Sequence, residues 1–153
     1  MNMTILAGAC LVALALASRV DAASFSPSAT SFKLTGTVQG ARNDRPQQCS
    51  GVLKGVTGAA GTAGAKIRPA TFTSTSGCGI VATGLPWTLT ATGPGAASLA
   101  GLAITLNGIA CGPDTIPITI DANGVFGIRA VQMRHGCSFI ATLPSKPKIT
   151  VTP

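Results

Sequence analysis

After the first 22 residues, few side chains of this chain could carry acid–base chemistry. That part of the chain has one histidine, His135, and three aspartates, with no glutamate and no tyrosine. A two-carboxylate glycosidase would need a pair among Asp44, Asp114 and Asp121. Each of these lies in a turn-like context: Asp44 in RNDRP, Asp114 after a Gly-Pro pair, and Asp121 ahead of Ala-Asn-Gly. Turn formation accounts for all three aspartates.

His135, in the segment QMRHGC, is the one candidate for a general base or a metal ligand. A Ser-His-Asp site would use it, but the sequence has no Gly-x-Ser-x-Gly nucleophile motif. A zinc site would need thiolates beside it. The N-terminal segment, described below, predicts export, and the cysteines of exported proteins are usually oxidised. We therefore expect His135 to be an exposed loop residue next to a disulfide, and we predict no catalytic, cofactor-binding or metal site.

The glycine-rich segment GVTGAAGTAGAK, Gly55 to Lys66, superficially resembles a phosphate-binding loop. A P-loop requires Gly-Lys followed directly by Ser or Thr. Here Ala65 separates Gly64 from Lys66, and Ile67 follows. We predict a mobile Gly/Ala loop between two strands instead.

Positive charge outweighs negative charge in this chain. It has 11 Lys and Arg against 4 acidic residues, a formal net charge of +7. The basic residues are scattered along the sequence, with no aromatic residues placed between them to stack on bases, which argues against nucleic-acid binding. We expect them to provide solubility and a loose attraction to an anionic cell envelope. A specific polyanion site is the alternative.

The N-terminal segment has the features of a cleaved signal peptide. TILAGACLVALALAS, Thr4 to Ser18, is an apolar run of suitable length, and VDA supplies small residues for cleavage. A retained anchor would need about 20 apolar residues, and Arg19 and Asp21 end this run early. We predict a signal peptide over 1–22 and one domain over 23–153, exported to the periplasm or beyond, with no later membrane-spanning segment.

Cys10 would be lost with the signal peptide, leaving Cys49, Cys78, Cys111 and Cys137. An even number of cysteines in an exported chain indicates two disulfides. Three connectivities are open. We favour sequential pairing, Cys49 with Cys78 and Cys111 with Cys137, because each would close a loop of roughly 30 residues and contribute about 3–4 kcal/mol.

Short β-rich runs, broken by Gly, Pro and Asn, fill the rest of the chain. In SFKLTGTVQ, Ser31 to Gln39, apolar and polar residues alternate as in a half-buried strand. Asp121 to Gly124 predicts a hairpin turn. The fold class we predict is all-β, a single antiparallel sandwich or barrel. The other strand candidates are CSGVLKGV, KIRPATFTST, LPWTLTAT, LAGLAITLNGIA, IPITID, VFGIRAVQM, CSFIATL and KITVT.

Trp87 is the only tryptophan in a chain with 4% aromatic residues. Pro86 cannot donate to a sheet, so Trp87 should stand at the start of a strand. The alternation in WTLTA places it on one face with small apolar neighbours. A core anchor is the first interpretation, because one buried Trp supplies much apolar area. The alternative is a hydrophobic contact site at the surface, with Phe72 and Phe126 as neighbours.

Several motifs occur in a recognisable order along the chain. They are ASFSPSATSFKLTGTV after the signal, a strand behind Cys49, GLPWTLTA after Cys78, ACGPDTIPITI, and LPSKPKITVTP after Cys137; the more specific pieces are Phe25-x-Pro27, Leu85-Pro86-Trp87 and Cys111-Gly112-Pro113. This order resembles the small exported bacterial proteins of the alkane oxidation protein activator family (PraB-like), over essentially all of the chain after the signal. The resemblance implies a non-enzymatic accessory protein that helps a cell use hydrocarbons. It supplies no catalytic residues.

We therefore predict an exported, non-enzymatic accessory protein that acts at cell–hydrocarbon or cell–surface contact through apolar and basic surface. Its expected partners are hydrophobic small molecules or anionic envelope components. Self-assembly is left open, and nucleic acid is not an expected partner. The alternative is a structural subunit of a pilus-like or biofilm-matrix assembly, because SFKLTGTVQGARNDRPQQC is an alternating strand that leads to a cysteine. An enzyme, such as a hydrolase of envelope polysaccharide, is disfavoured by the few titratable residues.

Overall fold

The computed structural model describes residues 22–153, so the predicted signal peptide lies outside the described residues except for its last position. The described chain is all-β apart from one 3₁₀ turn, η1 (Arg134–Gly136), which confirms the predicted fold class. The strands are β1 (Ser24–Ser26), β2 (Ser31–Arg42), β3 (Arg45–Thr57), β4 (Gly64–Thr73), β5 (Ile80–Thr83), β6 (Trp87–Gly93), β7 (Ala96–Leu106), β8 (Ile109–Ile120), β9 (Val125–Met133), β10 (Cys137–Lys146) and β11 (Thr150–Thr152).

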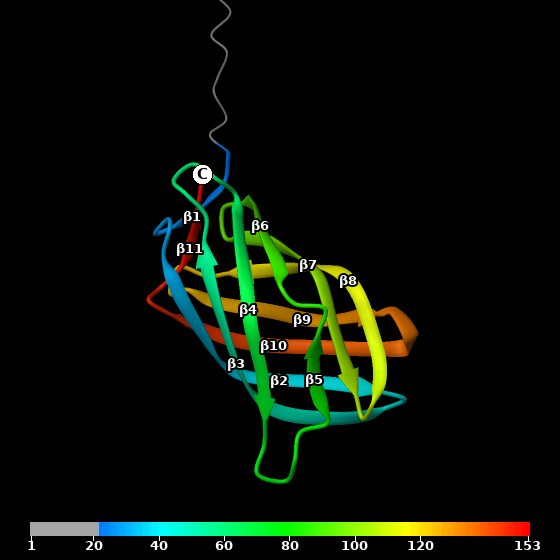
Figure 1. Cartoon of the computed structure of the whole chain (residues 1–153). Coiled ribbons are helices and arrows are strands. Elements are labelled where there is room, and N and C mark those ends of the chain that lie inside the picture. The colour runs from blue at the N-terminus through cyan, green and yellow to red at the C-terminus, as the bar shows by residue number, and fades with distance from the viewer. Residues whose placement is uncertain (1–21) are drawn as a thin grey trace, which may run out of the picture.

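Eight of the strands form an antiparallel barrel in the order β6-β4-β3-β2-β10-β9-β8-β7, and the pairing of β7 with both β6 and β8 closes it. β5 pairs with the later part of β7, beyond the part that pairs with β6. β1 and β11 pair with each other at one end of the barrel (Figure 1). In the same view β9 and β10 cross behind β4, β5 and β6 at a steep angle.

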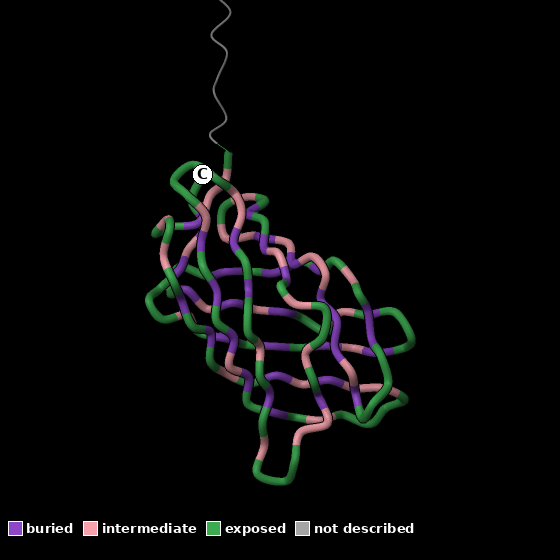
Figure 2. Tube along the Cα trace, viewed as in Figure 1, coloured by how far each residue is buried: buried purple, intermediate pink, exposed green. Residues whose placement is uncertain are grey.

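Alternation of apolar and polar residues explains which way each strand faces. In β2, Phe32, Leu34 and Val38 are buried, whereas Lys33 and Thr35 are exposed. The predicted strand from Ser31 to Gln39 is thus confirmed. Buried and exposed positions alternate in the same way along most strands of the barrel (Figure 2). An eight-stranded barrel has an interior just wide enough to be filled by side chains.

Turn residues set the register of the hairpins. Asn43 and Asp44, both with positive φ, join β2 to β3, and the predicted turn from Asp121 to Gly124 joins β8 to β9. One hairpin was not predicted: the run LAGLAITLNGIA is divided by Asn107 and Gly108, which have φ of 49° and 80°. Positive φ at both central residues is the geometry that favours Asn-Gly in two-residue hairpins.

The other differences from the sequence prediction concern short segments. β1 and β5 were not predicted, and they have only 3 and 4 residues. The predicted Gly/Ala loop is shorter than expected: β3 continues to Thr57 and β4 begins at Gly64, so the connection covers 58–63. Within 22–153, no helix has the length and apolar character of a membrane span.

One disulfide connects the barrel to a loop, and the other connects two barrel strands. Cys49 of β3 bonds Cys78, in the connection between β4 and β5, and Cys111 of β8 bonds Cys137 at the start of β10. The Cα atoms are 5.9 Å apart in each pair, within the usual range. This is the sequential pairing that the loop lengths favoured.

Candidate functional site

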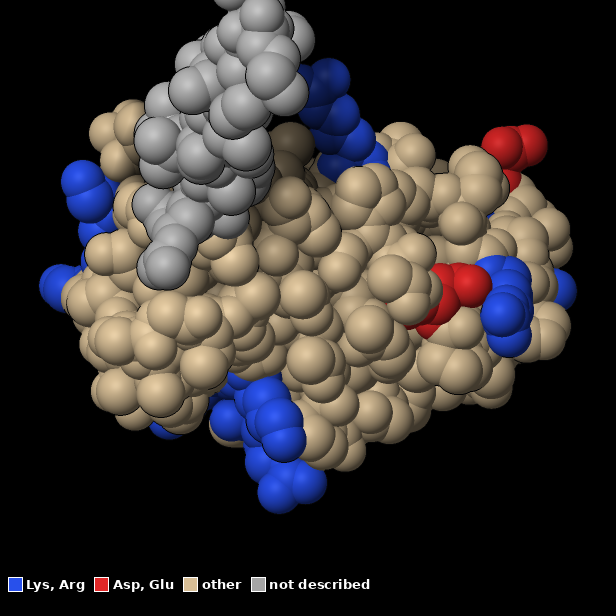
Figure 3. All heavy atoms as spheres, turned by 90° about the horizontal axis from the view of Figure 1, so that it is seen from above, with Lys and Arg blue, Asp and Glu red and all other residues tan. Residues whose placement is uncertain are grey.

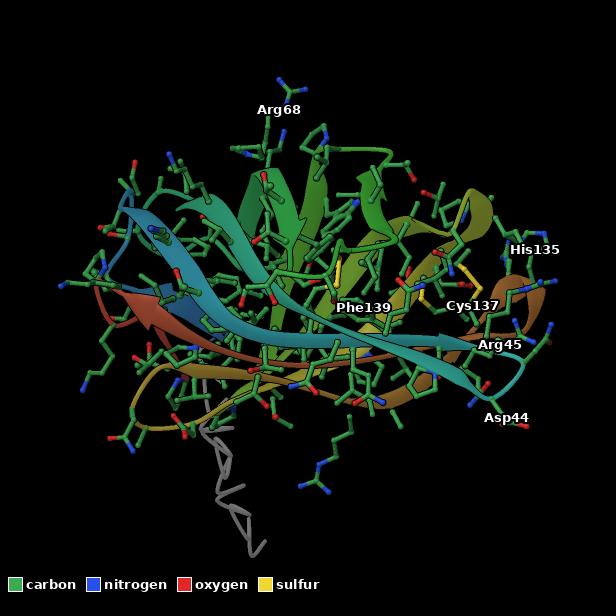
Figure 4. All side chains as sticks on the ribbon, turned by 90° about the horizontal axis from the view of Figure 1, so that it is seen from below. Asp44, Arg45, Arg68, His135, Cys137 and Phe139 are labelled. Atoms are coloured by element: carbon green, nitrogen blue, oxygen red, sulfur yellow. A yellow bond between two sulfur atoms is a disulfide. The ribbon has the colours of Figure 1, made fainter. Side chains whose placement is uncertain are left out.

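His135 lies in the 3₁₀ turn η1, where its side chain is exposed and its φ is 68°. Its backbone carbonyl accepts a hydrogen bond of 3.1 Å from Arg42 Nε. Figure 4 shows it at the end of the barrel near Cys137, whose sulfur belongs to the second disulfide. His135 is therefore an exposed loop residue next to a disulfide, as its sequence context indicates.

The three aspartates lie in three different structural settings. Asp44 is in the turn between β2 and β3. Asp121 Oδ1 accepts hydrogen bonds from the backbone N–H groups of Asn123 and Val125, at 2.8 and 2.9 Å. Asp114 lies inside β8 and not in a turn; its Oδ2 accepts from the Arg134 backbone N–H at 2.9 Å, and its Oδ1 is 3.3 Å from Arg134 Nε. Asp114 and Asp121 thus hold backbone segments in place.

The aromatic residues proposed as a contact site lie inside the barrel. Trp87 and Phe126 are 1% exposed and Phe72 is 8% exposed, so the folded protein does not offer them to a hydrophobic ligand. The Trp87 indole N–H donates to the Thr83 carbonyl at 2.9 Å, which satisfies its polar atom. Phe126 stacks on Phe32, and Phe72 packs edge-on against another phenylalanine. These side chains are core residues.

Four basic residues lie together on the barrel surface, although they are scattered in the sequence and were not predicted to meet. Lys146 of β10 stands opposite Lys33 of β2, and Lys33 stands opposite Lys54 of β3. Arg68 lies on β4, next to β3, at a shift in the register between the two strands. All four side chains are exposed, and they line one hollow of about 410 Å³. We call this the cationic hollow.

The cationic hollow carries positive charge that no described carboxylate offsets. Like charges directly opposite each other on neighbouring strands destabilise a sheet. Within 22–153 the one ion pair joins Arg134 to Asp114, so no carboxylate compensates the cationic hollow. Arg68 projects outward from its strand, away from the end that carries Asp44, Arg45 and His135 (Figure 4). An incoming carboxylate, phosphate or sulfate would relieve the repulsion among these cations.

An apolar hollow lies next to the cationic hollow and shares Val56 with it. Its volume is about 330 Å³, and its wall is mostly apolar, including Val56, Ala65 and two glycines, with Lys66 and Thr88 also lining it. Val56 is 51% exposed, which is unusual for a valine in a strand of this barrel. The two hollows together place positive charge beside accessible hydrocarbon surface on one face of β3 and β4.

A third hollow lies at the other end of β2 and β3. Arg42 and Arg45, which are opposite each other in the hairpin, line it together with Gln47, Asn107 and Ile109, and its volume is about 410 Å³. It combines two arginines with the side chain of Ile109, which is 42% exposed. The face drawn in Figure 3 carries basic side chains at separate places, few acidic ones, and uncharged surface between them.

A protein-family model described as alkane oxidation protein activator PraA/PraB-like matches residues 1–153. The chain belongs to this family. The match spans the whole chain and confirms the resemblance inferred from the order of motifs around the cysteines and Trp87. Neither the curated proteins nor the solved structures include a match to this chain.

The motifs around Trp87 and the cysteines have structural places in the barrel. The family description names an effect on alkane oxidation and no residue. The motif Leu85-Pro86-Trp87 delivers Trp87 to the core at the first residue of β6, and Cys111 and Cys137 form a disulfide. These motifs build the barrel. The cationic and apolar hollows are therefore the surface features to which a function can be attached.

Proposed function

We propose that the protein is an exported, non-enzymatic accessory factor for alkane oxidation that acts where the cell meets hydrocarbon or another surface. The observation that carries this proposal is the position of the cationic hollow beside the apolar hollow, with Val56 common to both. Basic charge attracts a protein to anionic surfaces, and exposed apolar surface next to it gives hydrophobic contact. The family match supports the link to alkane oxidation.

The setting of the titratable residues supports a role without catalysis. Asp114 and Asp121 bond backbone N–H groups, and His135 lies in an exposed turn. General acid–base catalysis needs such groups to converge on a substrate. The accessory role relies on surface contact and requires no such convergence.

Partition between water and hexadecane tests this function. We expect the disulfide-bonded protein to collect at the hexadecane–water interface and to lower the interfacial tension, measured by pendant drop. Droplets coated with an anionic surfactant should take up more protein than droplets coated with a non-ionic one, and added salt should reduce this difference. Protein that stays in the water and leaves the tension unchanged would contradict the proposal.

The alternative function, a subunit of a pilus-like or matrix assembly, has less support from the fold. Donor-strand assembly completes an open sheet with a strand from a neighbour. Here the pairing of β7 with β6 and β8 completes the barrel within one chain. Polymer ladders that survive mild detergent would favour the assembly role, whereas a monomer would favour the accessory role.

A further inference from the structure

We propose that the cationic and apolar hollows together form one binding site for a single-chain anionic amphiphile of the n-alkanoate class. The carboxylate head would bind in the cationic hollow, and the alkyl chain would run past Val56 into the apolar hollow. This inference rests on the proposed function and names the ligand class for the same surface.

The strand geometry places the head-group site and the chain site within reach of one small molecule. Lys54 and Val56 are two residues apart on β3 and are both exposed, so they share the outer face at a spacing of about 7 Å. On β4, Lys66 is opposite Val56, and Arg68 follows it by two residues on the same face. Neighbouring strands lie about 4.8 Å apart. A carboxylate between Lys54 and Arg68 would therefore have the hydrophobic wall beside it.

The composition of the cationic hollow favours an anionic head group over a neutral one. Lys33, Lys54, Arg68 and Lys146 lie together with no acidic residue lining the hollow. Arg68 presents a planar guanidinium that suits a carboxylate, and lysine ammonium groups add mobile positive charge. Binding of an anion would offset the cost of like charges on adjacent strands.

The composition of the apolar hollow favours an alkyl chain over a polyanion. A polyanion would use only the basic residues and would leave the exposed Val56 and the glycines of the apolar hollow without a partner. An alkyl chain would cover the half-exposed Val56. Oxidation of the terminal methyl group of an alkane to a carboxyl group is the class of reaction that supplies such a ligand. The site would therefore hold a product of the chemistry that the family description names.

Titration with sodium hexanoate, octanoate, decanoate and dodecanoate, each below its micelle concentration, tests this site by amide chemical shifts. We expect the shifts to map to β3 and β4. Affinity should rise by up to about fourfold per added methylene and should level off once the apolar hollow is filled. Alkyltrimethylammonium ions of the same lengths should not bind there, because their charge has the wrong sign.

Two variants separate the head-group site from the chain site. Lys54→Gln combined with Arg68→Gln should weaken binding of every alkanoate by about tenfold. Val56→Ser should weaken the binding of octanoate and longer alkanoates more than that of hexanoate, whose short chain covers less of the apolar surface. The matched controls are Arg129→Gln on β9 and Val81→Ser on β5, exposed residues outside both hollows. Circular dichroism and thermal unfolding should show that all variants fold.

The outcomes distinguish this inference from the proposed function. Alkanoate affinity that ignores chain length, or that is the same in the site variants and the controls, would overturn the amphiphile site. If the protein still collects on hexadecane, the proposed function would stand without it. If the protein ignores hexadecane and anionic droplets, the proposed function fails, whatever the alkanoate titration shows.

Discussion

At the scale of single residues, Trp87 is the core residue whose buried position the sequence indicates most directly. It begins β6 directly after Pro86, is 1% exposed, and its indole N–H donates to the Thr83 carbonyl. It is the largest of the fully buried side chains of the described residues. Its burial also makes it the natural spectroscopic reporter of the folded state.

Replacing Trp87 with alanine should lower the free energy of unfolding by about 3–5 kcal/mol, because a large cavity would remain in the core. Urea denaturation followed by circular dichroism would measure this loss, with Val81→Ala at an exposed position as the control. In the unmodified protein, tryptophan emission should be blue-shifted and protected from acrylamide. Red, readily quenched emission from the folded protein would contradict a buried Trp87.

At the scale of strands, register decides which basic residues become neighbours. Lys33, Lys54 and Lys146 are far apart in the sequence and look scattered there, but antiparallel pairing places them in one row. No pattern within a single strand carries this information, since it depends on which strands pair and at what offset. The cationic hollow was therefore not predictable from the one sequence.

Other features of the strands were predictable to different degrees. The alternation from Phe32 to Val38 and the Asp121–Gly124 turn identify β2 and the β8–β9 hairpin, because each is a local pattern. The Asn107-Gly108 hairpin carried the same turn signal, but apolar residues on both sides made the run resemble one strand. β5 is too short for alternation to identify it.

The row of lysines should cost stability, which gives a prediction at this scale. Lys54→Thr should raise the free energy of unfolding by about 0.2–1 kcal/mol at low salt, because it removes a like charge directly opposite Lys33. Lys66→Thr is the control, since it removes the same charge opposite the uncharged Val56 and Thr88. The gain should shrink as salt is added. Equal effects of both changes in thermal unfolding would show that the row is not under strain from its charges.

At the scale of the whole molecule, the barrel and its two disulfides form one framework. The disulfides close loops with sequence separations of 29 and 26 residues. Cys49–Cys78 fixes the connection between β4 and β5 to β3, and Cys111–Cys137 fixes η1 and the start of β10 to β8. Each bond restricts the unfolded chain and so favours the folded barrel.

Removing one disulfide by Cys49→Ser with Cys78→Ser should lower the free energy of unfolding by about 3–4 kcal/mol. Cys111→Ser with Cys137→Ser should have a similar effect, because the loops have similar lengths. Urea denaturation of both double variants, compared with the disulfide-bonded unmodified protein, would test this. Wild-type stability in either double variant would mean that the corresponding bond constrains the unfolded chain very little.

The contact surface itself provides the most direct test of the functional account. We would compare the uptake of two double variants by hexadecane droplets coated with an anionic surfactant, using droplet flotation and protein assay. Lys54→Gln with Val56→Ser removes charge and apolar surface at the paired hollows, whereas Arg129→Gln with Val81→Ser makes matched changes elsewhere. We expect the unmodified protein and the control variant to float with the droplets and the hollow variant to stay largely in the water. Equal uptake of all three proteins would contradict the assignment of contact to this face.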